Sequence, residues 1–320
     1  MSARRYRVLH TTGYRYAMPV ALSRQLLHLT PRELPTQRVL EHNIAVEPAP
    51  EESASAQDYF GNATSYIVLS SAHRSMSLAA SSTVELLPRD SAARIALSMP
   101  WEQAAEWLRT PANAANLEPA RYLFDSPHVI CAADLRDYAA PSFAAGRPLL
   151  EAALHLNHRI HEDFEFDPIA TVISTPLAEV LEQRRGVCQD FAHLMIGCLR
   201  TLGLSARYVS GYLLTQPPPG HAPLVGADAS HAWVGVFCPN AGWIDFDPTN
   251  DRLVDDEHIT LGWGRDFSDV TPTRGVILGG GEQDLTVHVT VTEIVPDSGA
   301  DAEQTQAQGQ SQSQSQTNTA

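Results

Sequence analysis

The chain has 320 residues, of which 43% are hydrophobic and 18% charged, enough for one large or two ordinary domains with a buried core. Its formal net charge of -15 at pH 7 argues against a nucleic-acid partner, because the phosphate backbone would be repelled over the whole surface. No apolar run is long enough for a signal peptide or a bilayer span, so we expect a cytoplasmic protein with no membrane partner.

Residues 1–90 carry the period-two alternation that is typical of β-strands. The clearest strand places five apolar residues on one side, namely Met76, Leu78, Ala80, Val84 and Leu86. Gly61-Asn62 is a hairpin turn signal between two further strand-like stretches. We expect a β-rich N-terminal module, and the sequence leaves open whether it shapes a cleft or joins copies of the chain into a homo-oligomer.

Residues 91–145 are expected to form a packed helical connector. Apolar residues persist through this stretch, but prolines divide it into short pieces, at Pro100, Pro111, Pro119, Pro127 and Pro141.

A second folded unit is expected over residues 146–295. It opens on a helix whose buried stripe is Leu149, Ala153, Leu156 and Ile160. The same helix carries His155, His158 and His161 on its other sides. Because a three-residue step turns a side chain by about 60°, His155 and His161 diverge by about 120° and cannot easily share one ion. We therefore expect no metal, and no other cofactor is indicated.

A short helix is expected next, with Thr175 as its N-cap and Pro176 as its first residue. Gly186 then lets the chain turn into the following helix.

The stretch RRGVCQDFAHLMIGCLRTLG places Cys188 at the start of an amphipathic helix. The buried face is predicted to hold Phe191, Leu194, Met195, Cys198, Leu199 and Leu202, and Gly203 supplies the stop. Free N–H groups and the positive end of the helix dipole favour a thiolate at Cys188, and Arg184 and Arg185 lie one turn upstream. Cys188 is therefore our candidate nucleophile.

The other cysteines have no such setting. Cys131, Cys188, Cys198 and Cys238 show no paired spacing, so we predict no disulfides. Cys198 fits a small buried core residue.

Residues 207–214 read as a strand that is followed by a loop rich in proline and glycine, residues 215–230. This loop is either a substrate lid or an ordinary surface loop. His231 then stands at the first position of a second strand. A nucleophilic thiol needs such a base, and the base needs a group that orients it.

A hairpin brings a carboxylate toward this histidine. Residues 243–247 alternate apolar and polar and end before Pro248, which closes the strand. Asp245 and Asp247 project from the same face of that strand, so parity alone cannot choose between them.

The C-terminal part is less informative. Trp263, among glycines, is a candidate for one wall of a cleft, and residues 285–295 alternate as a final strand. Residues 296–320 are rich in Gln and Ser and are expected to be disordered.

Three segments of the chain, RRGVCQDFAHLM, HAWV and GWIDFDPTN, resemble the catalytic boxes of the bacterial transglutaminase-like superfamily. The resemblance extends to QDYFGNATSY, FEFDPIATVISTPLAEVL and RDFSDVTPTRGVILGGGEQ, and so covers most of residues 1–295. Val187 and Gln189 differ from animal transglutaminases, which have Gln before the cysteine and Trp after it.

The resemblance implies an α+β protein with a papain-like transglutaminase core, whose catalytic helix packs on an antiparallel sheet, preceded by the β-rich module. It implies a triad of Cys188, His231 and Asp247, and so resolves the choice between the two aspartates.

The implied activity is thiol-dependent acyl transfer on amide, peptide or isopeptide bonds, as in a cysteine protease or amidohydrolase. We expect hydrolysis rather than cross-linking, because no feature indicates an amine site. The substrate would be a peptide or protein amide, and the alternative is a non-catalytic module that binds peptides or partners. The first oxyanion donor is expected to be the Cys188 N–H, with Gln183, Gln189 and Trp233 open as the second.

Overall fold

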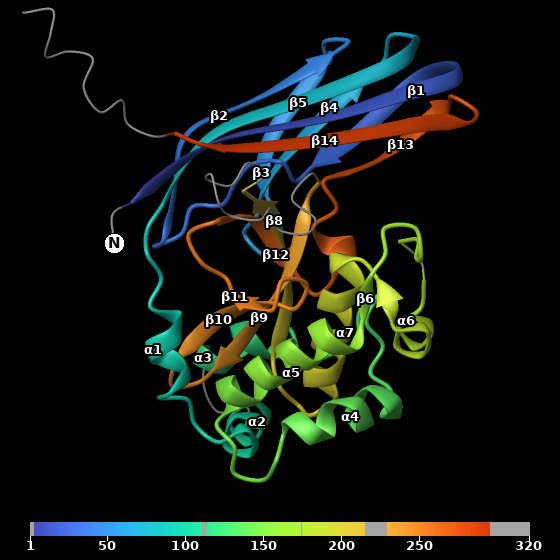
Figure 1. The fold of residues 1–320 in the computed structure, drawn as a ribbon. Coiled ribbons are helices and arrows are strands. Elements are labelled where there is room, and N and C mark those ends of the chain that lie inside the picture. The colour runs from blue at the N-terminus through green and yellow to red at the C-terminus, as the bar shows by residue number, and fades with distance from the viewer. Residues whose placement is uncertain (1–2, 111–113, 174, 215–228, 295–320) are drawn as a thin grey trace, which may run out of the picture.

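The computed structural model describes residues 3–110, 114–173, 175–214 and 229–294. Figure 1 shows an N-terminal sheet lying over a second layer, in which helices pack on a smaller sheet. The fold is α+β, as predicted. Most of the candidate lid at 215–230 and the whole tail from residue 296 lie outside the described residues.

Among the described residues, the N-terminal sheet has seven antiparallel strands. They are β1 (Arg4–Leu27), β2 (Gln37–Glu47), β3 (Glu52–Gln57), β4 (Ala63–Leu69), β5 (His73–Leu86), β13 (Thr273–Gly279) and β14 (Gln283–Glu293). Their order is β2-β5-β1-β4-β3, with β13 and β14 also paired to β1. All five residues of the apolar stripe predicted on β5 are buried, and β3 and β4 form the hairpin around Gly61, whose φ is +74°.

The final strand belongs to the N-terminal sheet. The second folded unit predicted from the sequence, residues 146–295, included this strand. In the structure β14 pairs with β1, from Tyr6↔Glu293 to Tyr16↔Gln283. The strand β1 is 24 residues long, and its backbone N–H and C=O groups pair with β4 and β5 and also with β13 and β14 from the far end of the chain. The two ends of the described chain therefore close one sheet.

In the part of the chain that the structure describes, the second sheet has five antiparallel strands. They are β8 (Ala206–Leu213), β9 (His231–Cys238), β10 (Gly242–Asp247), β11 (Arg252–Leu253) and β12 (His258–Gly264), in the order β11-β10-β9-β8-β12. A parallel pair of two residues each, β6 (Glu165–Phe166) and β7 (Arg185–Gly186), lies ahead of the helix that begins at Cys188. The strands predicted around His231 and Asp247 are confirmed.

The helices form the other half of this layer. They are α1 (Ser91–Ile95), α2 (Trp101–Arg109), α3 (Ala114–Ala120), α4 (Ala133–Ala139), α5 (Leu149–Asp163), α6 (Leu177–Gln183) and α7 (Cys188–Thr201), with 3₁₀ turns η1 (Ala140–Ser142) and η2 (Phe267–Asp269). Helices α5 and α7 pack on β9 around one hydrophobic core. The stripe predicted for α5 is fully buried, and Gly203 follows α7 with a φ of +75°.

A separate apolar cluster joins the two sheets. It contains Tyr6 and Val84 from the N-terminal sheet and Tyr212 and Ile259 from the second sheet, all nearly inaccessible to solvent. Burial of side chains of this size stabilises an interface by roughly 1.5–3 kcal/mol each. The N-terminal sheet is thus packed firmly against the layer that holds the candidate site.

Two local predictions are wrong. Thr175 does not cap α6, since that helix begins at Leu177 and the Thr175 hydroxyl instead accepts the Val172 N–H at 3.0 Å. Trp263 does not present a cleft wall, because its ring lies between the guanidinium groups of Arg32 and Arg207 at 3.6 and 3.8 Å. Each guanidinium group makes a cation–π interaction with the indole ring.

No helix among the described residues combines the length and the apolar character needed to cross a membrane.

Candidate active site

Helix α7 begins at Cys188, as predicted from the apolar pattern. The carboxylate of Asp190 accepts the backbone N–H of Val187 at 2.9 Å and the hydroxyl of Thr171 at 2.6 Å, which fixes the entry to the helix. A Cβ on Gly186 would lie 2.7 Å from this carboxylate, so glycine is required there. Burial raises the pKa of Asp190, against the effect of these two hydrogen bonds.

The two arginines upstream of Cys188 are engaged elsewhere. Arg184 lies 3.6 Å from Asp163, and Arg185 lies 3.1 Å from Glu165. The backbone of Arg184 is left-handed, with a φ of 56°, and its guanidinium contacts the rings of Tyr138 and Phe164. The expectation that these charges activate the thiol is not supported, because carboxylates already offset them.

Strands β9 and β10 bring His231 and Asp247 together. Nε2 of His231 lies 2.9 Å from Oδ2 of Asp247, and both side chains are completely buried. Burial alone would lower the pKa of His231, but the charge of Asp247 and the neighbouring Cys188 thiol raise it to about 10. Nδ1 of His231 has no hydrogen bond of ordinary geometry within the described residues. The structure therefore gathers Cys188, His231 and Asp247 at one place.

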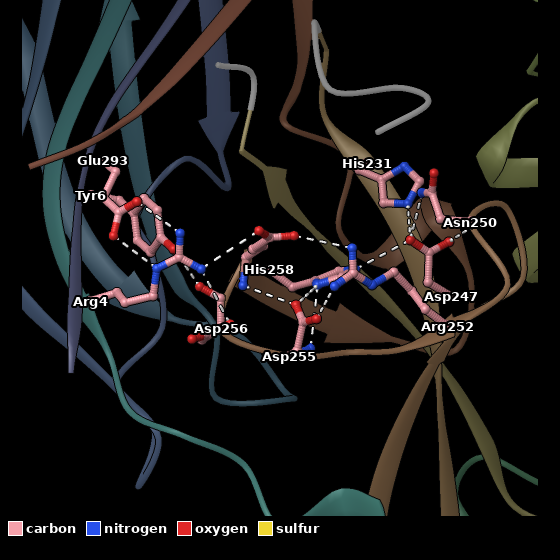
Figure 2. Close-up of polar contacts among 11 residues, drawn as sticks. Arg4, Tyr6, His231, Asp247, Asn250, Arg252, Asp255, Asp256, His258 and Glu293 are labelled. Atoms are coloured by element: carbon pink, nitrogen blue, oxygen red, sulfur yellow. Dashed lines mark hydrogen bonds and ion pairs between the residues drawn. The ribbon is translucent and has the colours of Figure 1, made fainter. Parts of the chain in front are cut away.

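Five donor groups of the described residues hold the Asp247 carboxylate. Oδ1 accepts the backbone N–H groups of Thr249 and Asn250 at 3.0 and 3.2 Å, and Oδ2 accepts the Asn250 side chain at 2.8 Å, His231 and, at 3.3 Å, His258. Figure 2 shows these groups converging on the carboxylate. Burial would raise the pKa of Asp247, but His231 and His258 hold it far below its usual range.

Asn250 and His258 were not found by the sequence reasoning. Asn250 stands in the quoted box GWIDFDPTN, where its position three residues after Asp247 permits a side-chain contact around the turn. No sequence signal marked His258, which follows the box after a further seven residues.

Asp245 does not reach the histidine. The register of the hairpin pairs Asp245 with Gly235, whereas Asp247 lies beyond the last pair, Phe246↔Val234, toward the start of β9. The Asp245 carboxylate lies 3.3 Å from Arg89 instead. Geometry thus distinguishes two residues that the strand pattern left equivalent.

The chain matches the family model described as "Transglutaminase-like superfamily" over residues 136–248 and the "Bacterial transglutaminase-like N-terminal region" over residues 6–85. It is also 41% identical over 302 residues to an uncharacterized protein of Mycobacterium tuberculosis, covering 92% of this chain and 94% of that one. The chain belongs to the transglutaminase-like superfamily.

Two other similarities bear on this transglutaminase-like protein. The crystal structure of a proposed cysteine protease from Cytophaga hutchinsonii superposes with a TM-score of 0.70 and 22% identity, covers 93% of each chain and shares the fold. A protein-glutamine gamma-glutamyltransferase of Pseudomonas aeruginosa is 34% identical over 109 residues, which are 33% of this chain and 16% of that one.

The histidines of α5 in the transglutaminase-like core diverge. Nδ1 of His155 lies 3.0 Å from the Ser142 hydroxyl, that of His158 lies 2.7 Å from Asp251, and that of His161 lies 2.9 Å from the Thr249 carbonyl. Within the described ranges no group of three or more His, Cys, Asp or Glu residues could hold a metal ion. His158 and His161 instead brace the loop that follows Asp247.

All four cysteines are free thiols. Cys198 is completely buried in the core, and burial raises its pKa well above the usual value. Burial likewise raises the pKa of Cys131, to about 11, and that of Cys238. These three thiols are poorly suited to act as nucleophiles.

The residues considered as oxyanion donors have different surroundings. Gln183 donates to Glu179 at 2.9 Å on α6, and the Trp233 indole N–H is buried beneath the surface. Gln189 remains half-exposed beside the nucleophile. Cys188, as the first residue of α7, has a backbone N–H with no acceptor in its own helix.

An apolar groove of about 510 Å³ runs beside the nucleophile. It is lined by Pro168, Thr171, Val172, Ile173, Val187, Gln189 and Asp190. Val172 and Ile173 are 70% and 61% exposed, so the groove presents apolar surface to solvent. The groove therefore reaches the residues immediately before and after Cys188.

Proposed function

We propose that this protein is a thiol-dependent enzyme that hydrolyses an amide bond of a peptide or protein through Cys188, His231 and Asp247. The observation that carries the proposal is the buried hydrogen bond from His231 to Asp247, with the other ring nitrogen left for the thiol of Cys188. A base oriented by a carboxylate beside a thiol at a helix N-terminus is the arrangement that thiol acyl transfer needs.

The reaction would proceed in two halves. Cys188 gives its proton to His231, and the thiolate attacks the amide carbonyl carbon, whose oxygen becomes an oxyanion facing the Cys188 N–H. His231 then protonates the leaving amine as the C–N bond breaks, which leaves a thioester. In the second half His231 takes a proton from water, the hydroxide displaces the thiolate, and the carboxylic acid leaves.

Asp247 would support both halves without gaining a proton itself. Its carboxylate accepts the Nε2–H of His231, which fixes the tautomer that leaves Nδ1 toward Cys188 and stabilises the imidazolium that forms. The raised pKa of His231 is what such support produces.

Transfer of the acyl group to an amine is the second candidate. The Pseudomonas aeruginosa relative, named a protein-glutamine gamma-glutamyltransferase, favours it. Hydrolysis is favoured here because Val187 and Gln189 replace the residues that flank the cysteine in animal transglutaminases. An amine would also attack the thioester in preference to water only in a site that excludes water.

The test is a screen of peptide and glutamine-side-chain amides with and without a primary amine, read by mass spectrometry. The protein blocked with iodoacetamide serves as the control. We expect a carboxylic acid product that depends on the free thiol and changes little when the amine is added. An amide of the added amine as the main product would assign transfer instead, and no product from any substrate would favour a non-catalytic peptide-binding module.

We further propose that the groove beside Cys188 receives an apolar side chain of the substrate. Val172 and Ile173 line it with exposed apolar surface, and Val187 and Gln189 continue it to the nucleophile. A substrate side chain held there would place its neighbouring amide over the thiol, because Val187 and Gln189, the residues on either side of Cys188, line the groove.

Replacing Val172 with Asp is expected to raise KM for substrates with an apolar residue near the cleaved bond by about tenfold, with kcat little changed. A charge in the groove disfavours apolar binding without reaching the triad. Val276→Asp is the matched control, since Val276 is 76% exposed on β13 of the N-terminal sheet. Equal KM values for the two variants would remove the groove from the substrate site.

A further inference from the structure

His258 is a buried imidazole at the first residue of β12, outside the boxes that resemble the family. Its Nε2 lies 3.3 Å from Oδ2 of Asp247, and its Nδ1 lies 3.0 Å from Oδ1 of Asp255. Figure 2 shows the ring between the two carboxylates. The Trp233 and His258 rings pack in a T-shaped arrangement, with their centroids 5.4 Å apart. The ring therefore links the candidate triad to the turn between β11 and β12.

That turn is anchored by cations from two sheets. Arg252 pairs with Asp255, and with Glu257 at 3.1 Å. Arg4 of β1 lies 3.6 Å from Glu257 and 2.8 Å from Glu293 of β14. The chain of contacts in Figure 2 thus runs from the N-terminal sheet to Asp247. A turn held from both sides gives His258 a fixed position.

We propose that His258 is a positioning residue that holds the Asp247 carboxylate in the orientation His231 requires. The proposal rests on the proposed function, in which Asp247 orients the base. The two ring nitrogens of His258 contact Asp247 and Asp255, so His258 acts through Asp247 rather than on the substrate.

The physical need follows from how Oδ2 of Asp247 is shared. The same oxygen accepts His231, Asn250 and His258. During the reaction the ring of His231 changes its charge, and the strength of its hydrogen bond to Asp247 changes with it. That bond therefore cannot by itself keep the carboxylate in one orientation. Asn250 and His258 hold Oδ2 independently of His231, and loss of either contact loosens the orientation of the carboxylate.

Two substitutions separate the two ends of the ring. In His258→Gln the side-chain amide nitrogen reaches about as far as Nε2 and keeps the bond to Asp247, whereas in His258→Asn it reaches only as far as Nδ1 and keeps the bond to Asp255. We expect His258→Gln to retain most of the turnover, and His258→Asn to lower kcat about 10- to 100-fold at unchanged KM. Equal losses in the two variants, or a loss confined to KM, would overturn the proposal.

A double-mutant cycle gives the second readout. If His258 acts through Asp247, His258→Asn should cost little further activity once Asp247 is replaced with Asn. Additive losses would overturn the positioning role and leave only a structural one. Should His258→Asn fail to fold by circular dichroism, Asp255→Ala takes its place, because that side chain is 35% exposed and its loss frees the far end of the ring, along with the Arg252 ion pair, while leaving the contact with Asp247. It should then lower kcat at unchanged KM, and unchanged kcat would overturn the proposal.

The rate of Cys188 alkylation by iodoacetamide is measured in the same variants. This rate depends on the thiol and His231 but needs no amide substrate. If no amide is turned over, the proposed function fails, yet the positioning role is still tested. It then predicts slower alkylation in His258→Asn than in His258→Gln only while Asp247 is present, and equal rates would contradict it.

Discussion

Replacing Asp247 with Asn is expected to lower turnover of an accepted amide about 10⁴-fold while the fold is kept. The Asn side chain has nearly the same shape, so the backbone donors of Thr249 and Asn250 still find an oxygen acceptor. The amide carries no charge, however, and can present N–H to His231, which favours the wrong tautomer. Steady-state kinetics on a substrate from the amide screen, with circular dichroism for the fold, measures the effect.

Asp245→Asn is the control within the same strand. Asp245 projects from the same face of β10, but its carboxylate pairs with Arg89 at 3.3 Å. We expect turnover to change far less than in Asp247→Asn, with a small loss of stability from the weakened ion pair. A larger loss of turnover in Asp245→Asn would assign the orienting carboxylate to the wrong residue, and full activity in both would argue against a triad mechanism.

Replacing Cys188 with Ala is expected to abolish amide turnover, a loss of about 10⁶-fold by comparison with other nucleophile deletions. The variant should also lose the rapidly alkylated thiol. Intact-protein mass spectrometry after brief exposure to iodoacetamide measures the second effect independently of any substrate.

Cys198→Ala is the matched control on the same helix. Cys198 is completely buried in the core, so its loss should lower the free energy of unfolding by about 1–2 kcal/mol in urea denaturation and leave turnover unchanged. If Cys188→Ala retained turnover, or if Cys131 or Cys238 proved to be the fast thiol, the nucleophile would be misassigned.

Local patterns in the sequence determined the elements that carry the candidate site. The 3.6-residue period after Cys188 placed it at the first residue of α7, and alternation placed His231 and Asp247 at the ends of two strands. These features depend on residues close together in the chain, and so a single sequence contains them. The resemblance of the three boxes added the choice of Asp247, which alternation had left open.

Contacts between distant segments were decided only by the tertiary structure. The register of β9 and β10 put Asp247 rather than Asp245 against His231, because two residues on one face of a strand differ only in what lies opposite them. Arg184 and Arg185 found carboxylates in Asp163 and Glu165 rather than the thiol, since ion pairing depends on the surroundings of a charge and not on its distance along the chain.

The same reason explains two further features that the sequence did not reveal. β14 completes the N-terminal sheet because it pairs with the backbone of the long strand β1, more than 250 residues away. The alternation of apolar and polar residues predicts a strand but not the strand with which it pairs. His258 gave no signal because a lone histidine at a strand start has no pattern of its own. The sequence by itself determined where the helix and strands of the site begin and end. The packing of the two sheets decided which side chains meet, because the energy of a contact depends on both residues and on their distance in space.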